Sequence, residues 1–425
     1  MRALLADQRF LRLLDALWLT ALMAFIVAGM PLATFHGDEA MQIYMSHDYA
    51  KAFIYGDPPG LMVGPPYYID TDPWLRILNG TINRHAIGLS WHLAGLTNGD
   101  LPPVPGWDWG LDYQTNVETG HRPSDRLLLA GRASSTLFLA LSAVVMFALG
   151  RQLGGRPLAY FASALYVMNP TILLNGRRAM MEGSMLLFGL LAVLMAAIIS
   201  HRRAAGGRGL WGWWLALTLA AGLALASKHS AAVFVAGAYG WVFVAELTRL
   251  RWRALLETTL KLAISAGLAA ALFIALSPAL WNDTPARVQD LFSVRAGLLE
   301  IQINADPLAP MPLAERIQQA VTQPFITPTA HYEVAAWAGY EPITQEITRY
   351  ISSPLSGVQW GAAGGLLLTL LAGVGVAALF IPRLRPAPIS GGQAAGLLVW
   401  LAVNLAFALV NPLPWQRYYL PLIPV

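Results

Sequence analysis

Nine stretches of this chain are apolar over about the length of a membrane-spanning helix. A helix needs about 20 residues to cross a bilayer core of about 30 Å. The predicted spans are 13–34, 127–150, 157–176, 179–200, 210–227, 229–245, 262–281, 357–381 and 389–410. The residues that lead to Val425 have the pattern of the start of another span. The pattern therefore predicts an all-α polytopic membrane protein with about nine or more transmembrane helices.

Two long segments interrupt the spans, and their pattern differs from that of a flexible linker. Residues 35–126 and 282–356 contain many Trp, Tyr and Phe residues, which favours packing against the membrane domain. Within the first segment, the apolar positions of 38–53 predict an amphipathic helix at the membrane interface. The more polar stretch 77–96 is typical of an interfacial or re-entrant helix. We therefore expect a single membrane domain, 1–425, with two large loops.

Composition agrees with a membrane environment. The 425 residues are 56% apolar and 12% charged, and the mean hydropathy is +0.51; soluble domains carry about twice as much charge. The first apolar stretch is longer than the core of a signal peptide, and no small-residue cleavage site follows it, so we expect it to remain as an anchor. The absence of cysteine excludes disulfides, zinc–cysteine sites and thiol catalysis.

The distribution of charge predicts the orientation. The segments 1–15, 151–156, 201–209, 246–261 and 382–388 together contain 14 Lys and Arg and four acidic residues. The two long loops contain 9 basic and 19 acidic residues. By the positive-inside rule, the N-terminus is cytoplasmic and both long loops are extracytoplasmic, as in a multi-pass protein of the plasma (inner) membrane. The pI of about 9.3 then reflects topology, and no nucleic-acid partner is expected.

Ionisable residues inside or beside the spans gather at the outer end. Each costs about 2.5–3.5 kcal/mol at the centre of a bilayer and therefore indicates a function or a buried partner. They are Asp38, Glu39, Arg132, Arg177, Arg178, Glu182, Lys228, His229 and Arg417. Carboxylates surrounded by cations predict a site for an anionic lipid headgroup, in which Arg and Lys bind a phosphate and a carboxylate accepts a proton.

Each of these residues also has a purely structural interpretation. Asp38 could be only the N-cap of the helix that it begins. Arg178 and Glu182 are spaced i, i+4 and could neutralise each other. Arg177 and Lys228 could extend their charges to the interface from helix ends. Arg132 lies about 9 Å inside its span at 1.5 Å per residue, too deep for that, so we expect it to have a partner.

A divalent cation is the one cofactor for which the residues offer a candidate site. His36 and His47 flank the acid pair, and with Asp38 and Glu39 they could form an oxygen and nitrogen ligand set. The spacing is unspecific, and histidines in loops are usually only solvated. We therefore assign no residue as a metal ligand.

Five motifs in order resemble the polyprenyl-phosphate-dependent GT-C glycosyltransferases, above all the protein O-mannosyltransferases and the lipid A aminoarabinose transferases. The motifs extend over most of the chain: "GDEA" after the first span, "AGRASSTLFLALS", "NPTILLNGRRAMMEGSMLLFGLLAVLMA", "ASKHSAAVF" and "QRYYLPLIP". The resemblance implies a GT-C-like fold and transfer of a sugar, mannose-like or another hexose or pentose, from a polyprenyl-phosphate donor. The acceptor would be an extracytoplasmic protein, lipid or glycan.

The same resemblance implies roles for individual residues. Asp38, with Glu39 beside it, matches the catalytic base of the first outer loop, which acts with inversion at the anomeric carbon. Arg132 and Arg417 match arginines that contact the donor phosphate, and Arg178 and Lys228 are expected to assist them.

Some positions depart from the aminoarabinose transferases. Met41 stands where those relatives have a basic residue, and "TDPWLRIL" lacks their Lys, for which Arg76 could substitute at the phosphate. Glu182 stands where relatives often have Asp. These departures keep open a second hypothesis, a non-catalytic scaffold subunit of a larger membrane complex. A transporter is disfavoured, because transporters place their charges near the midplane and these charges gather at one face.

Overall fold

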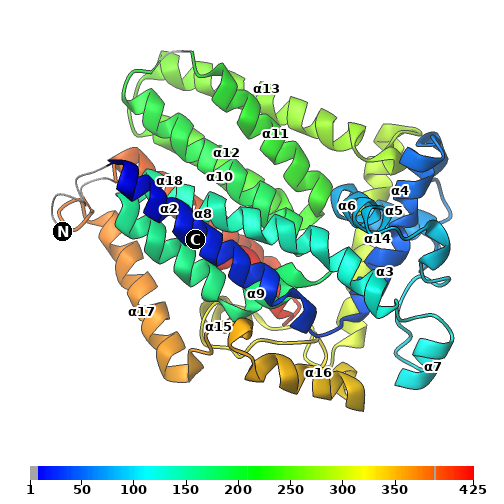
Figure 1. The fold of residues 1–425 in the computed structure, drawn as a ribbon. Helices are drawn as coiled ribbons and strands as arrows, with labels where there is room; N and C mark the ends of the chain where they lie inside the picture. Colours follow the sequence, from blue (N-terminus) through cyan, green and yellow to red (C-terminus); the bar gives the residue numbers. More distant parts are fainter. Residues whose placement is uncertain (1–7, 208, 387–388) are drawn as a thin grey trace.

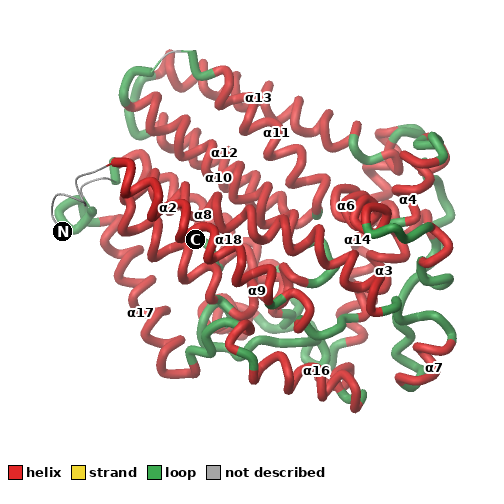
Figure 2. Tube along the Cα trace, in the orientation of Figure 1, coloured by secondary structure: helices red, strands yellow, loops and turns green. Residues whose placement is uncertain are grey.

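The computed structural model describes residues 8–207, 209–386 and 389–425. Within these ranges the chain forms helices and loops and no strand (Figures 1 and 2). The bundle consists of α2 (Gln8–Ala28), α8 (Asp125–Met168), α9 (Pro170–Arg177), α10 (Glu182–Ala204), α11 (Trp211–Ser227), α12 (Ala232–Leu247), α13 (Trp252–Ala275), α17 (Gly361–Phe380) and α18 (Gly391–Val410). The all-α class is confirmed.

Shorter helices fill the segments between the spans. The first long loop and the turn before it contain η1 (Met30–Leu32), α3 (Gly37–Met45), α4 (His47–Tyr49), η2 (Ala50–Ile54), η3 (Pro59–Leu61), α5 (Asp72–Leu78), α6 (Thr81–Leu93), η4 (Asn98–Asp100) and α7 (Tyr113–Glu118). The later segments contain η5 (His229–Ala231), η6 (Pro278–Leu280), α14 (Thr284–Ala305), α15 (Leu313–Thr322), η7 (Ala335–Ala338), α16 (Glu341–Ser352), η8 (Pro354–Ser356) and η9 (Gln416–Leu422). The predicted helix over 38–53 is present as α3, α4 and η2.

Helix α10 lies at the centre of the bundle and packs against α8, α11, α12 and α18. It is apolar on all sides, as a helix surrounded by other helices has to be. Helices α2, α13 and α17 lie at the periphery and expose most of their apolar surface. Seven described helices are long and apolar enough to cross a membrane, and α11 is a shorter apolar helix. The chain is thus a multi-pass membrane protein, and the count of nine spans stays a prediction.

The second and third predicted spans are two arms of α8, separated by a reversal at Gly154 and Gly155. Gly155 has φ 73°, a conformation that favours glycine. The third span, predicted as continuous over 157–176, is interrupted at Asn169. Its side chain accepts hydrogen bonds from the N–H groups of Thr171 and Ile172 and so begins a new helix, α9.

Helix α13 begins at Trp252, ten residues before the predicted span 262–281, and ends at Ala275. The polar residues Glu257 and Lys261 are separated by one helical turn and pair with each other, so they extend the helix. After Ala275 the chain turns through η6 at Pro278.

The two long loops lie at one end of the bundle and pack against each other. In Figure 1, α3 to α7 lie at the end opposite the links between α10 and α11 and between α12 and α13. Trp109 stacks on Trp337 with ring centroids 4.7 Å apart, and Trp107 contacts Tyr340 at 5.4 Å. Phe292, one of the aromatic residues of the second long loop that were expected to pack, is instead 70% exposed. Three predicted inner segments, 1–15, 201–209 and 382–388, extend into residues outside the described ranges.

Candidate active site

Helix α3 begins with a capping box made by His36 and Glu39. His36 Nδ1 accepts from the N–H of Asp38 at 3.1 Å, and Glu39 Oε2 accepts from the N–H of His36 at 3.1 Å. Both acids stand in the first turn, where the helix dipole favours negative charge. The N-cap is therefore His36, so the interpretation of Asp38 as the cap is wrong and its carboxylate is free for other contacts.

Glu39 points into the protein and is fully buried. Its oxygens accept from Arg132 Nε at 2.7 Å and Nη2 at 2.8 Å, and Oε1 also accepts from the N–H of Ala179 at 2.8 Å. Burial alone would raise the pKa of Glu39, but Arg132 more than offsets this and holds the pKa below its ordinary value. Arg132 thus has the buried partner that its depth in the span required, and Glu39 connects α3 to α8 and to the turn between α9 and α10.

Asp38 points the other way, into a cavity, and its side chain is 35% exposed. It forms an ion pair with Arg417, whose Nε lies 2.8 Å from Glu333 Oε1. Glu333 Oε2 in turn lies 2.9 Å from His36 Nε2. Burial would raise the pKa of Asp38, but Arg417 and His36 more than offset this, so its pKa is lowered and the carboxylate is ionised at neutral pH.

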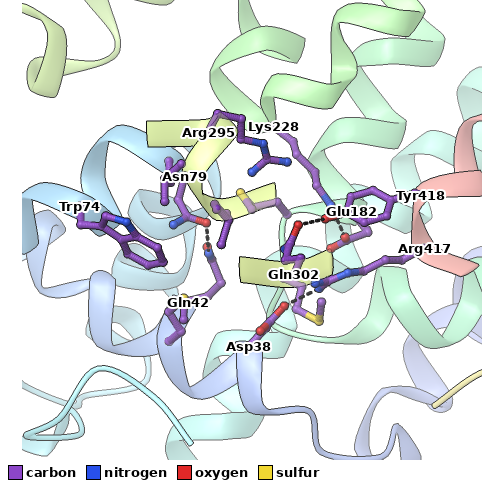
Figure 3. A pocket seen from close by; sticks show the side chains of 15 residues that line it. Asp38, Gln42, Trp74, Asn79, Glu182, Lys228, Arg295, Gln302, Arg417 and Tyr418 are labelled. Atoms are coloured by element: carbon purple, nitrogen blue, oxygen red, sulfur yellow. Dashed lines mark hydrogen bonds and ion pairs between the residues drawn. The ribbon is translucent and has the colours of Figure 1, made fainter. Parts of the chain in front are cut away.

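The cavity beside Asp38 has a volume of about 140 Å³ and is lined from six parts of the chain (Figure 3). Helix α3 contributes one wall and α5 with Asn79 another, and the rest comes from the start of α10, the turn after α11, helix α14 and η9. Its polar lining residues are Asp38, Gln42, Asn79, Glu182, Lys228, Arg295, Gln302, Arg417 and Tyr418.

The cations of the cavity differ in their partners. Lys228 Nζ lies 2.5 Å from Glu182 Oε1, and Arg417 holds Asp38 and Glu333. Arg295, half-buried on α14, forms no hydrogen bond or ion pair with any described residue. It is therefore the cation of this cavity that is not neutralised by a neighbouring acid.

Arg178 and Arg177 are buried and bind backbone groups outside the cavity. Arg178 donates to the carbonyl groups of Thr34 and His331, and Arg177 donates to those of Phe25, Ile26 and Leu355. Arg178 and Glu182 do not neutralise each other, because 178–181 lie between two helices and the i, i+4 geometry does not apply. Arg177 does not extend to the interface, because its donors are used inside the protein.

Arg76 belongs to a separate buried charge cluster. It donates to Asp48 Oδ1 at 2.7 Å and to Asp72 Oδ2 at 2.8 Å. His47 lies between the same two acids, and Arg84 lies 3.4 Å from Asp48. This cluster joins α4, α5 and α6 behind the wall that carries Asn79 and contributes no lining residue to the cavity.

The histidines on either side of the acid pair turn to different partners. His36 faces Glu333, whereas His47 faces Asp48 and Asp72. In the part of the chain that the structure describes, no three His, Asp or Glu side chains are grouped as a metal site. The four-residue ligand set considered from the sequence is therefore not formed.

Sequence reasoning missed Gln42, Asn79, Arg295, Gln302 and Glu333. One helical face of α14 lines the cavity with Arg295, Leu298 and Gln302, which are spaced i, i+3 and i+7. This spacing was the sequence pattern from which a shared face could have been predicted. Glu333 lies in a loop, where no periodicity applies.

Comparison with known proteins relates part of the chain to one family. Residues 106–282 match the family model described as dolichyl-phosphate-mannose-protein mannosyltransferase, so the resemblance predicted from the motifs is confirmed. The matched range contains Arg132, Arg178 and Lys228, whereas Asp38 and Arg417 lie outside it. No curated protein matches the chain significantly.

Among solved structures, the chain is similar to the Saccharomyces cerevisiae protein O-mannosyltransferase Pmt1-Pmt2 complex bound to the sugar donor. The sequence identity is 16% and the TM-score is 0.44. The match covers 64% of this chain and 34% of that chain, so this chain spans about a third of the length of its solved relative.

Proposed function

We propose that this protein is a membrane glycosyltransferase that moves a hexose, mannose in the first instance, from a polyprenyl-phosphate donor to an acceptor hydroxyl. The observation that carries this proposal is the cavity in which the Asp38 carboxylate stands among Lys228, Arg295 and Arg417. Phosphoryl oxygens suit such cations, and an ionised carboxylate suits the removal of a hydroxyl proton. The family match over 106–282 supports the same class.

The reaction that fits this site is a single displacement with inversion. Asp38 accepts the proton of the acceptor hydroxyl while the hydroxyl oxygen forms a bond to the anomeric carbon. The bond from that carbon to the phosphate oxygen breaks, and the polyprenyl phosphate leaves with the electron pair. Lys228, Arg295 and Arg417 stabilise the negative charge that develops on the leaving phosphate.

Arg417 gives the site a means of adjusting the basicity of Asp38. Its guanidinium forms ion pairs with both Asp38 and Glu333 and lowers the pKa of Asp38. A donor phosphate would share this guanidinium, so the pKa of Asp38 would rise towards that of an effective base once the donor has bound.

The neutral end of the cavity suits the sugar. Gln42 Nε2 donates to Asn79 Oδ1 at 3.0 Å, and Gln42 Oε1 accepts from Asn83 at 3.2 Å. Asn79 Nδ2 also donates to the carbonyl group of Leu75 at 3.0 Å. The three bonds fix the amides of Gln42 and Asn79 and leave one N–H of each for a hydroxyl oxygen. Trp74 lines the same end and offers an apolar face to a pyranose ring. Arg76 supports this wall through Asp48 and is proposed as a positioning residue.

The remaining assignments follow from the charge distribution. We place the N-terminus in the cytoplasm and the cavity on the extracytoplasmic side of the plasma membrane. A carboxylate and three cations line the cavity and provide the proton transfer and the charge stabilisation that this displacement needs. The acceptor can be a protein, lipid or glycan hydroxyl.

The experiment is transfer of radiolabelled mannose from polyprenyl-phosphate mannose by purified protein in lipid. We expect Asp38→Asn to lower kcat by about 10²–10⁴-fold, the usual contribution of a general base. Asp57→Asn is the control, because among the described residues the Asp57 side chain accepts only from the N–H of Gly60, in an exposed turn. Equal transfer by wild type and Asp38→Asn would contradict the assignment of the base. Absence of transfer by the wild type with mannose, glucose and aminoarabinose donors would support the scaffold hypothesis.

A further inference from the structure

A second cavity of about 270 Å³ lies on another side of the acid pair, where η1, the start of α8 and α16 meet. Its charged lining residues are Arg122, Asp125, Arg132, Glu346 and Arg349. None of them lines the cavity beside Asp38. The proposed transfer reaction therefore leaves this cavity without a role.

Two of its arginines have donors that no described residue uses. Arg132 binds Glu39 through Nε and Nη2, so its Nη1 group is left for the cavity that the side chain lines. The exposed guanidinium of Arg349 forms no hydrogen bond or ion pair with a described residue. Together they provide N–H donors for an anion such as a phosphate.

The carboxylates of the cavity can also accept further hydrogen bonds. Asp125 Oδ1 accepts from Arg122 at 2.8 Å, and the Asp125 side chain is 82% exposed. Glu346 Oε2 accepts from the N–H of Phe35 at 2.8 Å, and its Oε1 lies 3.6 Å from Arg122. A ligand with one phosphate and one ammonium group would therefore find partners of opposite charge for both.

An apolar stripe leads away from this cavity along α8. Leu129 lines the cavity, and Leu137 and Leu141 follow at multiples of four residues on the same helical face. All three side chains are exposed on a helix that is long and apolar enough to span the membrane. In a bilayer such a stripe faces acyl chains. One lipid molecule could therefore place its headgroup in the cavity and its acyl chains on the stripe.

We propose that this cavity binds the headgroup of a phospholipid that carries a primary ammonium, of the phosphatidylethanolamine class. Its phosphodiester accepts from Arg349 and from Nη1 of Arg132, and its ammonium donates to Asp125 and Glu346. Arg132 also binds Glu39, the neighbour of Asp38 in the first turn of α3, so the lipid supports the helix end that presents the carboxylate. The site does not depend on the identity of the transferred sugar.

The test is native mass spectrometry of the detergent-purified protein with phosphatidylethanolamine, phosphatidylcholine and phosphatidylglycerol of equal chain length. We expect phosphatidylethanolamine to be retained best, and Arg349→Gln and Asp125→Asn each to weaken its retention about tenfold or more. Neither variant removes a buried group, and elution volume together with thermal unfolding verifies the fold. Arg383→Gln, at the other end of the bundle, is the control and should retain the lipid.

Three results would overturn the proposal. One is equal retention of the three lipids by wild type and by Arg349→Gln. Another is a preference for phosphatidylglycerol, which has no ammonium, that Asp125→Asn leaves unchanged. The third is displacement of phosphatidylethanolamine by polyprenyl phosphate together with its loss in Arg295→Gln, which would assign the lipid to the cavity beside Asp38.

Discussion

Arg417 and Asp38 form an ion pair although 379 residues separate them in the chain. Arg417 belongs to η9, and Asp38 belongs to the first turn of α3. Glu333, from the second long loop, shares the same guanidinium at 2.8 Å. Three distant parts of the chain thus meet at one cation, which controls the charge of the proposed base.

Arg417→Gln is expected to shift the pH dependence of transfer. Arg417 lowers the pKa of Asp38, so its removal raises that pKa, and the base then needs a higher pH to be deprotonated. The acid limb of kcat/KM should move to higher pH, and kcat should fall about 10²-fold or more because the leaving phosphate loses a cation. Arg417→Lys, which keeps the charge, should retain more activity. If the acid limb of kcat/KM stays at the same pH in Arg417→Gln, Asp38 is not the base that accepts the proton.

Glu39→Gln is expected to affect stability more than Asp38→Asn does. The substitution leaves Arg132 buried without its counter-charge, which typically costs about 3–5 kcal/mol. Asp38 faces a cavity, so Asp38→Asn should change thermal unfolding little. The double variant Glu39→Gln with Arg132→Met should recover part of the loss, because it removes the unpaired charge. Equal melting temperatures for Glu39→Gln and wild type would show that the pair does not stabilise the fold.

Arg295→Gln should weaken donor binding without loss of stability. The guanidinium forms no hydrogen bond or ion pair with a described residue, so its removal leaves no buried group unpaired. A charged hydrogen bond contributes about 1.5–3 kcal/mol, so kcat/KM for the donor should fall about 10- to 100-fold. Steady-state kinetics with varied donor measures this, with Glu300→Gln on the same helix as control. A fall in melting temperature without a change in kcat/KM would indicate a structural role.

His47 should make stability depend on pH in the alkaline range. Burial would lower its pKa, but hydrogen bonds with Asp48 and Asp72 outweigh this and raise the pKa from 6.5 to about 9. Because the folded pKa exceeds the unfolded one, the stabilisation is fully present below about pH 6.5 and is lost as the pH rises through about 9. The melting temperature should fall across this window and fall less in His47→Gln. A parallel decline in both proteins would exclude His47 as the cause.

The apolar pattern predicted most of the bundle, because a stretch that spans a bilayer must be both long and apolar. It missed the start of α13, since Glu257 and Lys261 made a helical segment polar. It also missed the break at Asn169, because capping interrupts a helix without interrupting the apolar pattern.

The acid pair was found from the sequence, but not the different roles of its members. Successive residues on a helix point about 100° apart, so Asp38 faces the cavity while Glu39 faces Arg132. Which of the two faces the cavity depends on how α3 packs, and that is a long-range property. Arg295 and Glu333 reach the site through folded loops for the same reason.

The pair formed by Glu39 and Arg132 also bears on how the chain is made. Glu39 leaves the ribosome 93 residues before Arg132, so the acid is already available when α8 enters the bilayer. We expect Arg132, seven residues after the start of α8, to be inserted as half of a neutral pair and not as a lone charge. The order of the two residues in the gene therefore favours co-translational insertion of α8. If insertion of α8 depends on this pair, Glu39→Gln should lower the yield of full-length protein in the membrane during synthesis.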